Sequence, residues 1–384
     1  MAGALNGLRV LDLTQHLAGP YCAMLLADQG ADVIRIEKPE KGDDARQMPP
    51  FVGGESAPFM LWNRNKRSVV LDLKTIEGKA LLERLAQSAD VLIENFRPGT
   101  MERLGLGYAE LAARNPRLVY CAISGFGQSG PYSRRGGFDL MIQAMSGLMS
   151  VNGEPDGAPL RLPIAISDVA GGLMGAVGIL SALVAREKSG RGQAVDVSLY
   201  DSAIALGVYE AAYFFATGKN PPRLGQAHRG SSPYQVFRSK DGWITVGGAT
   251  QELWLRLCRL LGCEELARDE RFSDNARRVA NNAALVELLQ VPLARETSAH
   301  WLAKLEAEGI PAGPVVTHAE VFADPQVRAR EMVVEVEHPS AGRMATLGVP
   351  IKLSETPGKV RRPAPRLGEH TEEVLAELAR EWAE

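Results

Sequence analysis

Cysteine and histidine are scarce in this sequence, and neither occurs in a metal-binding arrangement. The four cysteines, Cys22, Cys121, Cys258 and Cys263, form no Cys-x-x-Cys pair, and the six histidines are scattered. Zinc sites need such ligands at short, regular spacings, so we expect no bound metal. Because there is no disulfide framework either, we expect a reduced, cytoplasmic protein.

An excess of positive charge is also absent. The 43 Lys and Arg residues stand against 46 Asp and Glu residues, which gives a formal net charge of −3. Proteins that bind nucleic acids or anionic membranes usually carry a broad basic field. We therefore expect neither kind of partner.

Long hydrophobic runs are missing as well. Residues 1–6 lack the pattern of a signal peptide. The longest apolar stretch, residues 169–185, contains four glycines and is shorter than the roughly 20 residues of a membrane span. This stretch predicts a buried helix whose Gly171 and Gly175 allow close approach of another backbone.

What the sequence does contain is an alternation of strand and helix patterns over its first third. The expected strands are residues 8–13, 31–36, 68–73, 91–93 and 118–123, and the expected helices are residues 21–29, 76–88 and 108–113. Such βαβ units form parallel sheets with helices packed on their faces. The fold class is therefore α/β, with a doubly wound parallel sheet.

The rest of the chain has a different pattern. A helix over 201–217 and a polar Gly/Pro stretch at 218–225 precede strands at 234–237 and 243–246 and amphipathic helices up to residue 308. With 384 residues, more than one core usually covers, we expect a second, smaller α+β domain here. A strand at 333–336 and a last helix at 371–382 follow.

The first turn of the sheet argues against a dinucleotide cofactor. Residues 14–20 lack the Gly-x-Gly-x-x-Gly spacing that lets a pyrophosphate approach, although Glu37 follows the second strand where a ribose-binding acid is expected. Lys38, Lys41 and Arg46 come next and favour a phosphorylated ligand. A solvated loop would explain the same charges.

Two further polar clusters flank strands of this sheet. Residues 63–67 combine amides with cations, and residues 94–103 combine an amide, an aromatic ring and guanidinium groups. Arg and Lys bind phosphates, and open α/β sheets bind ligands at the carboxyl ends of their strands. Ordinary turns and caps would explain either cluster alone.

Asp168 stands where the apolar run 162–167 meets the apolar helix that begins at Val169. Asp is a common N-cap residue, which is one interpretation of this position. The other is a nucleophile, because N–H groups at a helix start favour the ionised carboxylate. The remaining motifs favour the second interpretation.

Taken together, the motifs resemble the class III coenzyme A (CoA) transferase family, the group of formyl-CoA transferase and carnitine CoA-transferase. The matching motifs, in order, are Val10–Thr14 with Ala18–Pro20, Gly30–Glu37, Asn65–Ser68, Glu94–Phe96 with Pro98–Gly99, Gly125–Pro131 and Asp168. They cover nearly the whole chain.

The resemblance implies a set of site residues. It makes Asp168 the nucleophile, which passes through an aspartyl anhydride and an aspartyl-CoA thioester and needs no tightly bound cofactor and no metal. It assigns Gly247 and Gly248 to a loop that shields the anhydride from water. The implied CoA-binding residues are Lys38, Leu71, Lys74, Asn95, Phe96 and Arg103.

The resemblance also implies a domain arrangement and an oligomer. Residues 1–200 and 331–384 would form a Rossmann-like, discontinuous large domain, and residues 225–325 a small domain. Residues 201–224 and 326–330 would link them, and two chains would interlock as a homodimer.

Two alternatives remain open. Racemases of 2-methylacyl-CoA share this fold but use a Gly-His-Asp motif, where this chain has Phe138, which cannot accept a proton. His16 is the only substitute we identify. A CoA-binding protein that has lost catalysis is the other alternative.

Three segments resemble the branch of the family that includes succinyl-CoA:glutarate CoA-transferase, namely residues 50–56, 227–234 and 336–339. We therefore expect a donor such as succinyl-CoA and a dicarboxylate acceptor. A dicarboxylate needs a cation for its distal carboxylate. We predict that Arg229 supplies it and that His16 also contacts substrate.

Overall fold

The structure is a computed structural model that describes residues 3–381, and its chain divides into two compact units. Unit 1 comprises Met1–Met149, Arg161–Gly218 and Pro325–Glu384, whereas unit 2 comprises Ser150–Leu160 and Lys219–Asp324. Unit 1 is thus discontinuous in sequence. The segment 150–160, which the sequence analysis placed in the large domain, is grouped with unit 2.

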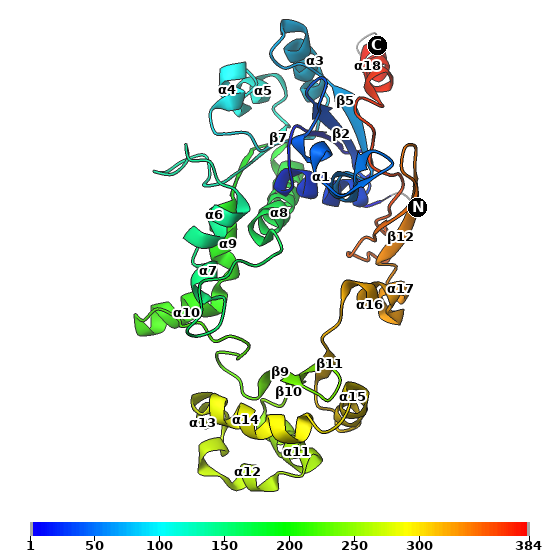
Figure 1. The fold of residues 1–384 in the computed structure, drawn as a ribbon. Helices are drawn as coiled ribbons and strands as arrows, with labels where there is room; N and C mark the ends of the chain where they lie inside the picture. The colour runs from blue at the N-terminus through cyan, green and yellow to red at the C-terminus, as the bar shows by residue number, and fades with distance from the viewer. Residues whose placement is uncertain (1–2, 382–384) are drawn as a thin grey trace. The chain divides into compact units, whose positions relative to one another are not determined.

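A six-stranded parallel sheet lies at the centre of unit 1 (Figure 1). Its strands are β1 (Arg9–Asp12), β2 (Asp32–Glu37), β5 (Lys66–Val70), β6 (Val91–Glu94), β7 (Val119–Ser124) and β8 (Ala194–Ser198). The order across the sheet is β5-β2-β1-β6-β7-β8. This is the order of a dinucleotide-binding doubly wound sheet, whose ligand crevice lies where the order reverses, here between β1 and β6.

Helices and two small hairpins complete unit 1. The longer helices are α1 (Ala18–Asp28), α3 (Ile76–Gln87), α8 (Ile166–Ser189), α9 (Leu199–Leu206), α10 (Val208–Thr217) and α18 (Thr371–Glu381). The shorter ones are η1 (Asp44–Gln47), α2 (Ala57–Trp62), α4 (Thr100–Leu104), α5 (Tyr108–Arg114), α6 (Asp139–Met145), α7 (Leu148–Val151), which spans the boundary with unit 2, and α17 (Pro325–Ala329). The hairpins pair β3 (Phe51–Val52) with β4 (Glu55–Ser56) and β12 (Val333–His338) with β13 (Gly342–Leu347).

Both faces of the sheet are covered by apolar cores, as buried parallel strands require. On β1, Val10 belongs to a core with Cys22 of α1 and Ile179 of α8. The next residue, Leu11, points to the opposite face and belongs to a second core with Leu82 of α3. The sheet is therefore the middle layer of three.

Helix α8 packs closely on one side only. A Cβ atom at Gly172 would lie 2.7 Å from the Ala18 carbonyl oxygen, and one at Gly175 would lie 2.9 Å from Ile123 Cδ1. The helix is long and apolar enough to cross a membrane by length and composition. Its other face exposes Val177 and Val184 to 60% and 62%, so the expectation of a fully buried helix was wrong for that face.

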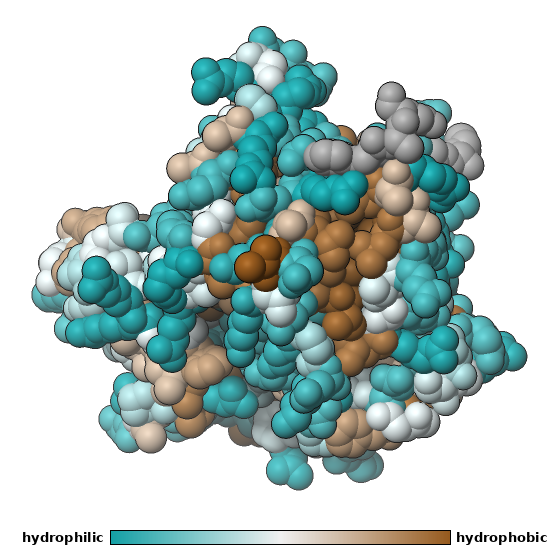
Figure 2. Space-filling view, turned by 90° about the horizontal axis from the view of Figure 1, so that it is seen from above, coloured by the Kyte–Doolittle hydropathy of each residue, from teal (hydrophilic) through white to brown (hydrophobic). Residues whose placement is uncertain are grey.

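Exposed apolar side chains occur along neighbouring elements too, including Tyr209 and Phe215 of α10. Figure 2 shows another view of the surface, in which hydrophobic residues gather in a brown area between hydrophilic ones. Contiguous exposed apolar surface commonly marks an interface in proteins.

Unit 2 combines a small antiparallel sheet with helices around a core of its own. Its strands are β9 (Tyr234–Arg238), β10 (Trp243–Gly247) and β11 (Ala312–Pro314). Its helices are α11 (Gln251–Leu261), α12 (Glu264–Arg268), η2 (Glu270–Phe272), α13 (Asn275–Ala280), α14 (Asn282–Leu293), α15 (Ser298–Ala307) and α16 (His318–Ala323). Phe237, Trp254 and Leu285 are buried together in this core.

Several expected elements differ in detail. The strand expected over 68–73 runs from Lys66 to Val70, and the helix expected over 201–217 is two helices that meet at Gly207. Strands β3, β4, β8, β11 and β13 had not been expected. The last helix begins at Thr371 as expected, and Trp382, its expected end, lies outside the described residues.

Candidate active site

Two pockets of unit 1 meet at the carboxyl ends of β1 and β6, and both are lined by Gln15 and Phe96. The first has a volume of about 280 Å³ and the second of about 330 Å³. Asp168 lines only the second pocket. The fold thus places a carboxylate beside the crevice in which doubly wound sheets bind ligands.

The turn between β1 and α1 forms the wall that both pockets share. Asn95, which follows β6, accepts a hydrogen bond from Gln15 N and donates one to Gln15 O, each at 2.8 Å. His16 has a φ of 63°, an angle that non-glycine residues rarely adopt. The turn therefore depends on side-chain hydrogen bonds rather than on the glycines of a dinucleotide-binding loop.

The first pocket collects most of the residues predicted to bind CoA. Lys38, Leu71, Lys74 and Phe96 all line it. Lys38 and Lys74 are exposed, and the Nζ atom of Lys38 lies 2.6 Å from Asp44 Oδ1. Two cations at the rim of an apolar slot can bind phosphates and a flat base.

Arg103 is the predicted CoA residue that lines neither pocket. Its side chain is exposed on α4 and donates a hydrogen bond from Nη2 to Thr100 Oγ1 at 2.9 Å. Thr100 itself lines the first pocket. Arg103 is therefore one side chain away from that pocket.

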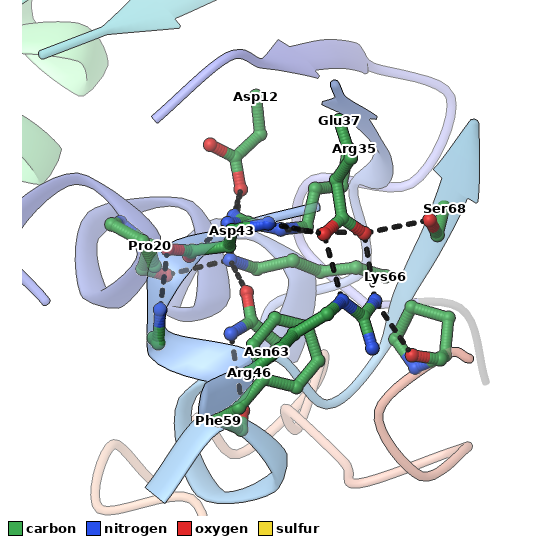
Figure 3. A network of polar contacts seen from close by, with 12 residues as sticks. Asp12, Pro20, Arg35, Glu37, Asp43, Arg46, Phe59, Asn63, Lys66 and Ser68 are labelled. Carbon is green, nitrogen blue, oxygen red and sulfur yellow. Dashed lines mark hydrogen bonds and ion pairs between the residues drawn. The ribbon is translucent and has the colours of Figure 1, made fainter. Parts of the chain in front are cut away.

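Arg35, Glu37 and Asp43, which line the first pocket, belong to a buried network of charges. Figure 3 shows this network. Arg35 and Lys66 both bind Asp12 Oδ2, at 3.0 Å and 2.9 Å. Arg35 also pairs with Asp43 and donates to the Thr14 carbonyl oxygen at 3.0 Å. Because Asp43 Oδ1 accepts from His16 N at 3.1 Å, the network fixes the same turn that Asn95 holds.

The charges in this network keep its acids ionised. Burial alone would raise the pKa of Asp12, but the charges of Lys66 and Arg35 outweigh burial and lower that pKa to about 2. Burial also opposes ionisation of Glu37, and its hydrogen bonds from Arg46 with the charge of Arg35 lower its pKa to about 2. Both acids are therefore ionised at neutral pH, whereas burial lowers the pKa of the Lys66 ammonium to about 8.

Lys41 and Arg46 were expected, with Lys38, to favour a phosphorylated ligand, but neither of them lines the first pocket. Arg46 is 8% exposed and its Nη2 lies 2.7 Å from Glu37 Oε1, so both residues are occupied in the interior. Lys41 lies in the exposed loop between Glu37 and Arg46. Of the three cations after the second strand, Lys38 is the one at the pocket.

The cluster at residues 63–67 is structural as well. Arg64 pairs with Asp28 at 2.7 Å, and Arg67 pairs with Asp32 at 2.6 Å. Lys66 is the central cation of the buried network. These side chains are used inside unit 1, whereas the cluster at residues 94–103 supplies residues to both pockets.

Asp168 is the third residue of α8 and not its N-cap, so the capping interpretation was wrong. The N-cap position is Ala165, which offers no side-chain hydrogen bond. The cap comes instead from Asp139 at the start of α6, whose Oδ1 accepts from Ser167 N at 2.9 Å. Asp168 therefore does not cap the helix, and it lines the second pocket.

The surroundings of Asp168 favour its protonated form. Burial, together with the nearby charge of Asp139, raises the pKa of Asp168 to about 7. The position of Asp168 at a helix start predicts a lowered pKa, and desolvation of the carboxyl group reverses that direction. A carboxyl group with a pKa near neutrality is a common feature of catalytic sites.

Other polar groups line the pocket of Asp168. They include His16, Arg97 and Arg135, and the sequence analysis had singled out only the first of these. The Arg135 guanidinium lies 4.1 Å from the ring centroid of Tyr132. The His16 ring meets Phe138 edge-on at 6.2 Å. The pocket therefore holds cations beside a carboxyl group.

Gly247, Gly248 and Arg229 belong to unit 2. Gly247 N donates to Pro311 O at 2.8 Å, and Gly248 N donates to Pro233 O at 2.9 Å. Gly247 and His228 line a pocket of that unit, and Arg229 donates from Nη2 to Pro222 O at 3.2 Å. Unit 1 alone builds the pocket of Asp168, without these three residues.

A buried cation holds the residues after these glycines. Arg278 is fully buried and donates to Ala249 O and Gln251 Oε1, both at 2.9 Å. Its Nε donates to Ser232 O at 2.7 Å. The segment is thereby anchored to α13. Over residues 3–381, no group of three His, Cys, Asp or Glu side chains is arranged to hold a metal ion.

Fold and pockets together define a doubly wound α/β protein with a carboxyl group of raised pKa beside its ligand crevice. Comparison with known proteins gives the family: the profile of CoA-transferase family III matches residues 5–371, and the chain belongs to that family. It is a CoA-transferase, as its motifs predicted.

The most similar relatives point the same way. The chain is 42% identical to succinate–glutarate CoA-transferase of Agrobacterium fabrum, over 97% of this chain and 95% of that protein. It is 39% identical to succinyl-CoA:glutarate CoA-transferase of Mus musculus, over 98% of this chain and 86% of that protein. A crystal structure of a CAIB/BAIF family protein from Brucella suis matches with a TM-score of 0.89 at 42% identity, covering 98% of this chain and all of that one.

Proposed function

We propose that this CoA-transferase moves CoA from succinyl-CoA, or a similar donor, to a dicarboxylate, with Asp168 as the nucleophile. One observation carries the proposal: Asp168 lines a pocket that shares Gln15 and Phe96 with the pocket of Lys38, Leu71 and Lys74. A thioester whose CoA lies in the first pocket can extend past Phe96 toward the carboxyl group in the second.

The first half of the reaction removes CoA from the donor. A carboxylate oxygen of Asp168 attacks the thioester carbonyl carbon, the C–S bond breaks, and its electron pair leaves on the CoA sulfur. The thiolate then attacks the Asp168 carbonyl carbon of the anhydride, and the donor acid leaves as a carboxylate. The activation of the acyl group is conserved in each covalent intermediate.

The second half repeats these steps with the acceptor. The acceptor carboxylate attacks the aspartyl-CoA carbonyl carbon and expels the CoA thiolate, and the thiolate attacks the acceptor acyl carbon of the new anhydride. The Asp168 carboxylate is thereby restored. The scheme balances without water, a metal or a redox partner.

CoA recognition is assigned to the first pocket and its rim. Lys38 and Lys74 would bind phosphate, Leu71 and Phe96 would contact the base and the pantetheine arm, and Asn95 would hold the turn beside it. Arg103 would approach phosphate from α4. Exclusion of water from the anhydride is assigned to Gly247 and Gly248 of unit 2.

The substrate class is inferred from relatives and charge. The relatives from Agrobacterium fabrum and Mus musculus are named for succinate or succinyl-CoA and glutarate. A dicarboxylate acceptor needs a cation for its second carboxylate. We assign that contact to Arg229, with His16 as a further substrate contact.

We also propose that the chain works as an interlocked homodimer, with residues 1–200 and 331–384 as the large domain. The exposed apolar face of α8, including Val177 and Val184, supports an interface there, because a large apolar surface is unfavourable in water. The boundaries of the small domain, residues 225–325, belong to the same proposal.

The nucleophile can be identified by trapping. The protein is incubated with succinyl-CoA, treated with hydroxylamine, and digested for peptide mass spectrometry. We expect an aspartyl hydroxamate at position 168. Asp201 is a matched control, since it is also the third residue of a helix, α9, and is exposed outside both pockets.

A protein that only binds CoA would give no hydroxamate at all. Modification at another carboxylate, with Asp168→Asn retaining transfer, would show that Asp168 is not the nucleophile.

A further inference from the structure

Two buried side chains of α6 hold the segment that leads into Asp168. Asp139 and Gln143 lie one turn apart on this helix and are 8% and 0% exposed. Gln143 Nε2 donates to Asp139 Oδ2 at 2.7 Å, and Asp139 Oδ1 accepts from Ser167 N at 2.9 Å. Helix α6 is thereby tied to the first turn of α8.

Gln143 extends this contact along the chain before α8. Its Oε1 accepts from Leu162 N at 2.9 Å, and its Nε2 lies 3.3 Å from the carbonyl oxygens of Leu162 and Ile164. The apolar side chains of this segment are themselves exposed, Ile164 to 64%. Hydrogen bonds to α6, rather than apolar packing, therefore hold the segment before α8 in place.

A neutral cap would have been enough to hold a helix start. Ser, Thr and Asn cap helices as well as Asp does, and a buried carboxylate near a second one is unfavourable. A charged cap such as Asp139 beside Asp168 is therefore energetically unfavourable, and the need for a cap does not by itself explain it. The carboxylate has an effect on Asp168 that a neutral cap would lack.

We propose that Asp139 and Gln143 are positioning residues for Asp168: they fix residues 162–167, and the negative charge of Asp139 strengthens the Asp168 carboxylate as a nucleophile. This inference rests on the proposed role of Asp168. Both residues fix the position of the segment that leads into α8. Asp139 alone has an electrostatic effect on Asp168.

Electrostatics of the pocket agree with this division. Burial is the main cause that raises the pKa of Asp168, and Asp139 is the charge that adds to it. The other ionisable groups that line the pocket are His16 from the β1–α1 turn, Arg97 after β6, and Arg135 before α6. These three are cationic when charged, so they cannot replace Asp139 in this role.

Two variants separate charge from position. Asp139→Asn retains an oxygen for Ser167 N but removes the charge, and Gln143→Ala retains the charge but releases the segment 162–167. The titration of Asp168 is followed by carboxyl ¹³C NMR with labelled aspartate, and the signal is assigned by its loss in Asp168→Asn. Transfer kinetics are measured from pH 5 to pH 9.

For Asp139→Asn we expect the Asp168 midpoint to fall by about one pH unit, the usual effect of removing a nearby like charge. The acidic limb of the pH profile of kcat should shift by the same amount as the Asp168 midpoint. For Gln143→Ala we expect a kcat at least about tenfold lower, because misplacement of a reacting group is costly, with an Asp168 midpoint near that of the parent. KM for succinyl-CoA should change little in both.

Asp274→Asn is the matched control, since Asp274 Oδ1 caps α13 by accepting from Arg277 N at 2.8 Å. It should leave the kinetics and the Asp168 midpoint unchanged. An unshifted Asp168 midpoint in Asp139→Asn overturns this inference alone. So does a result in which the variants change KM and leave kcat unchanged. Full transfer activity in Asp168→Asn overturns the proposed function together with it.

Discussion

Asn95 holds the backbone of Gln15 on both sides, by accepting from its N–H and donating to its carbonyl oxygen at 2.8 Å each. The two residues come from the neighbouring central strands β1 and β6, where the strand order reverses. One amide side chain therefore shapes the wall between the two pockets. Loss of the Asn95 side chain should affect ligand binding in both pockets.

Replacement of Asn95 should weaken CoA binding. Asn95→Asp keeps the acceptor for Gln15 N but places an oxygen against Gln15 O, so we expect KM for succinyl-CoA to rise about tenfold, the equivalent of one lost hydrogen bond with an unsatisfied partner. Asn115→Asp is the control, because Asn115 donates to Ala86 O and Ala89 O away from the pockets. An equal rise in KM for both variants would refute the special role of Asn95.

The rate of transfer should fall in mild acid. With a pKa of about 7, Asp168 is protonated at lower pH, and only the ionised carboxylate can attack the thioester. We expect log kcat/KM to decline below pH 7 with a slope approaching one per pH unit. Stopped assays of succinyl-CoA consumption over pH 5–9 test this, and a flat profile down to pH 5 would contradict it.

Neutralising Asp168 should stabilise the protein while it abolishes transfer. A carboxyl group whose pKa is raised on folding destabilises the folded state when ionised, fully above pH 7 and progressively less as the pH falls toward its ordinary value of 3.8. We expect Asp168→Asn to raise the free energy of unfolding at pH 8 by about 1–3 kcal/mol. Thermal unfolding at pH 8 and pH 4.5 measures this, and the gain should shrink at the lower pH.

Breaking the buried charge network should be costly. Lys66→Met removes one of the two cations on Asp12 and leaves that acid in the interior, so we expect a loss of about 3–5 kcal/mol in the free energy of unfolding. The exposed pair of Arg343 and Glu335 provides the control, since Arg343→Met should cost less than about 1 kcal/mol. Urea titrations of both variants compare the two, and losses of similar size would contradict a structural role for the network.

Arg229 should select for the second carboxylate of the acceptor. We expect Arg229→Ala to raise KM for glutarate about tenfold or more, since a charge-assisted hydrogen bond would be lost, and to leave KM for a monocarboxylate such as butyrate nearly unchanged. Arg223→Ala is the control, because Arg223 is another arginine of the same segment of unit 2, Lys219–Asp324. Equal effects on both acids would remove Arg229 from acceptor recognition.

Alternation of apolar strands and amphipathic helices was enough to predict the central sheet. Val10 and Leu11 show why, because each lies in a different core and the two faces of the strand are both apolar. Strand β8 was missed because it lies at the edge of the sheet with Ala194 and Asp196 exposed, so that Asp196 interrupts its apolar pattern. The helix start at Asp168 was misjudged because its cap comes from Asp139, 28 residues earlier in sequence.

Residues that follow strands directly were the easiest pocket residues to predict from the pattern of the sequence. Asn95 and Phe96 come at once after β6, and the structure places both at the pockets. Arg97 lies in the predicted cluster 94–103 but was not assigned a role of its own, and Arg135 was missed because exposed arginines are common. The pair Asp139 and Gln143 did carry a signal, since two polar residues four positions apart interrupt an otherwise apolar helix.

The separate core of unit 2 has a thermodynamic consequence. Trp254, Phe237 and Leu285 belong to a buried cluster whose members all lie in unit 2, whereas the two cores against the parallel sheet belong to unit 1. Cooperative melting requires a shared interior. Calorimetry of this chain should therefore resolve two heat-absorption peaks, and a single number for its melting temperature would conceal one of them.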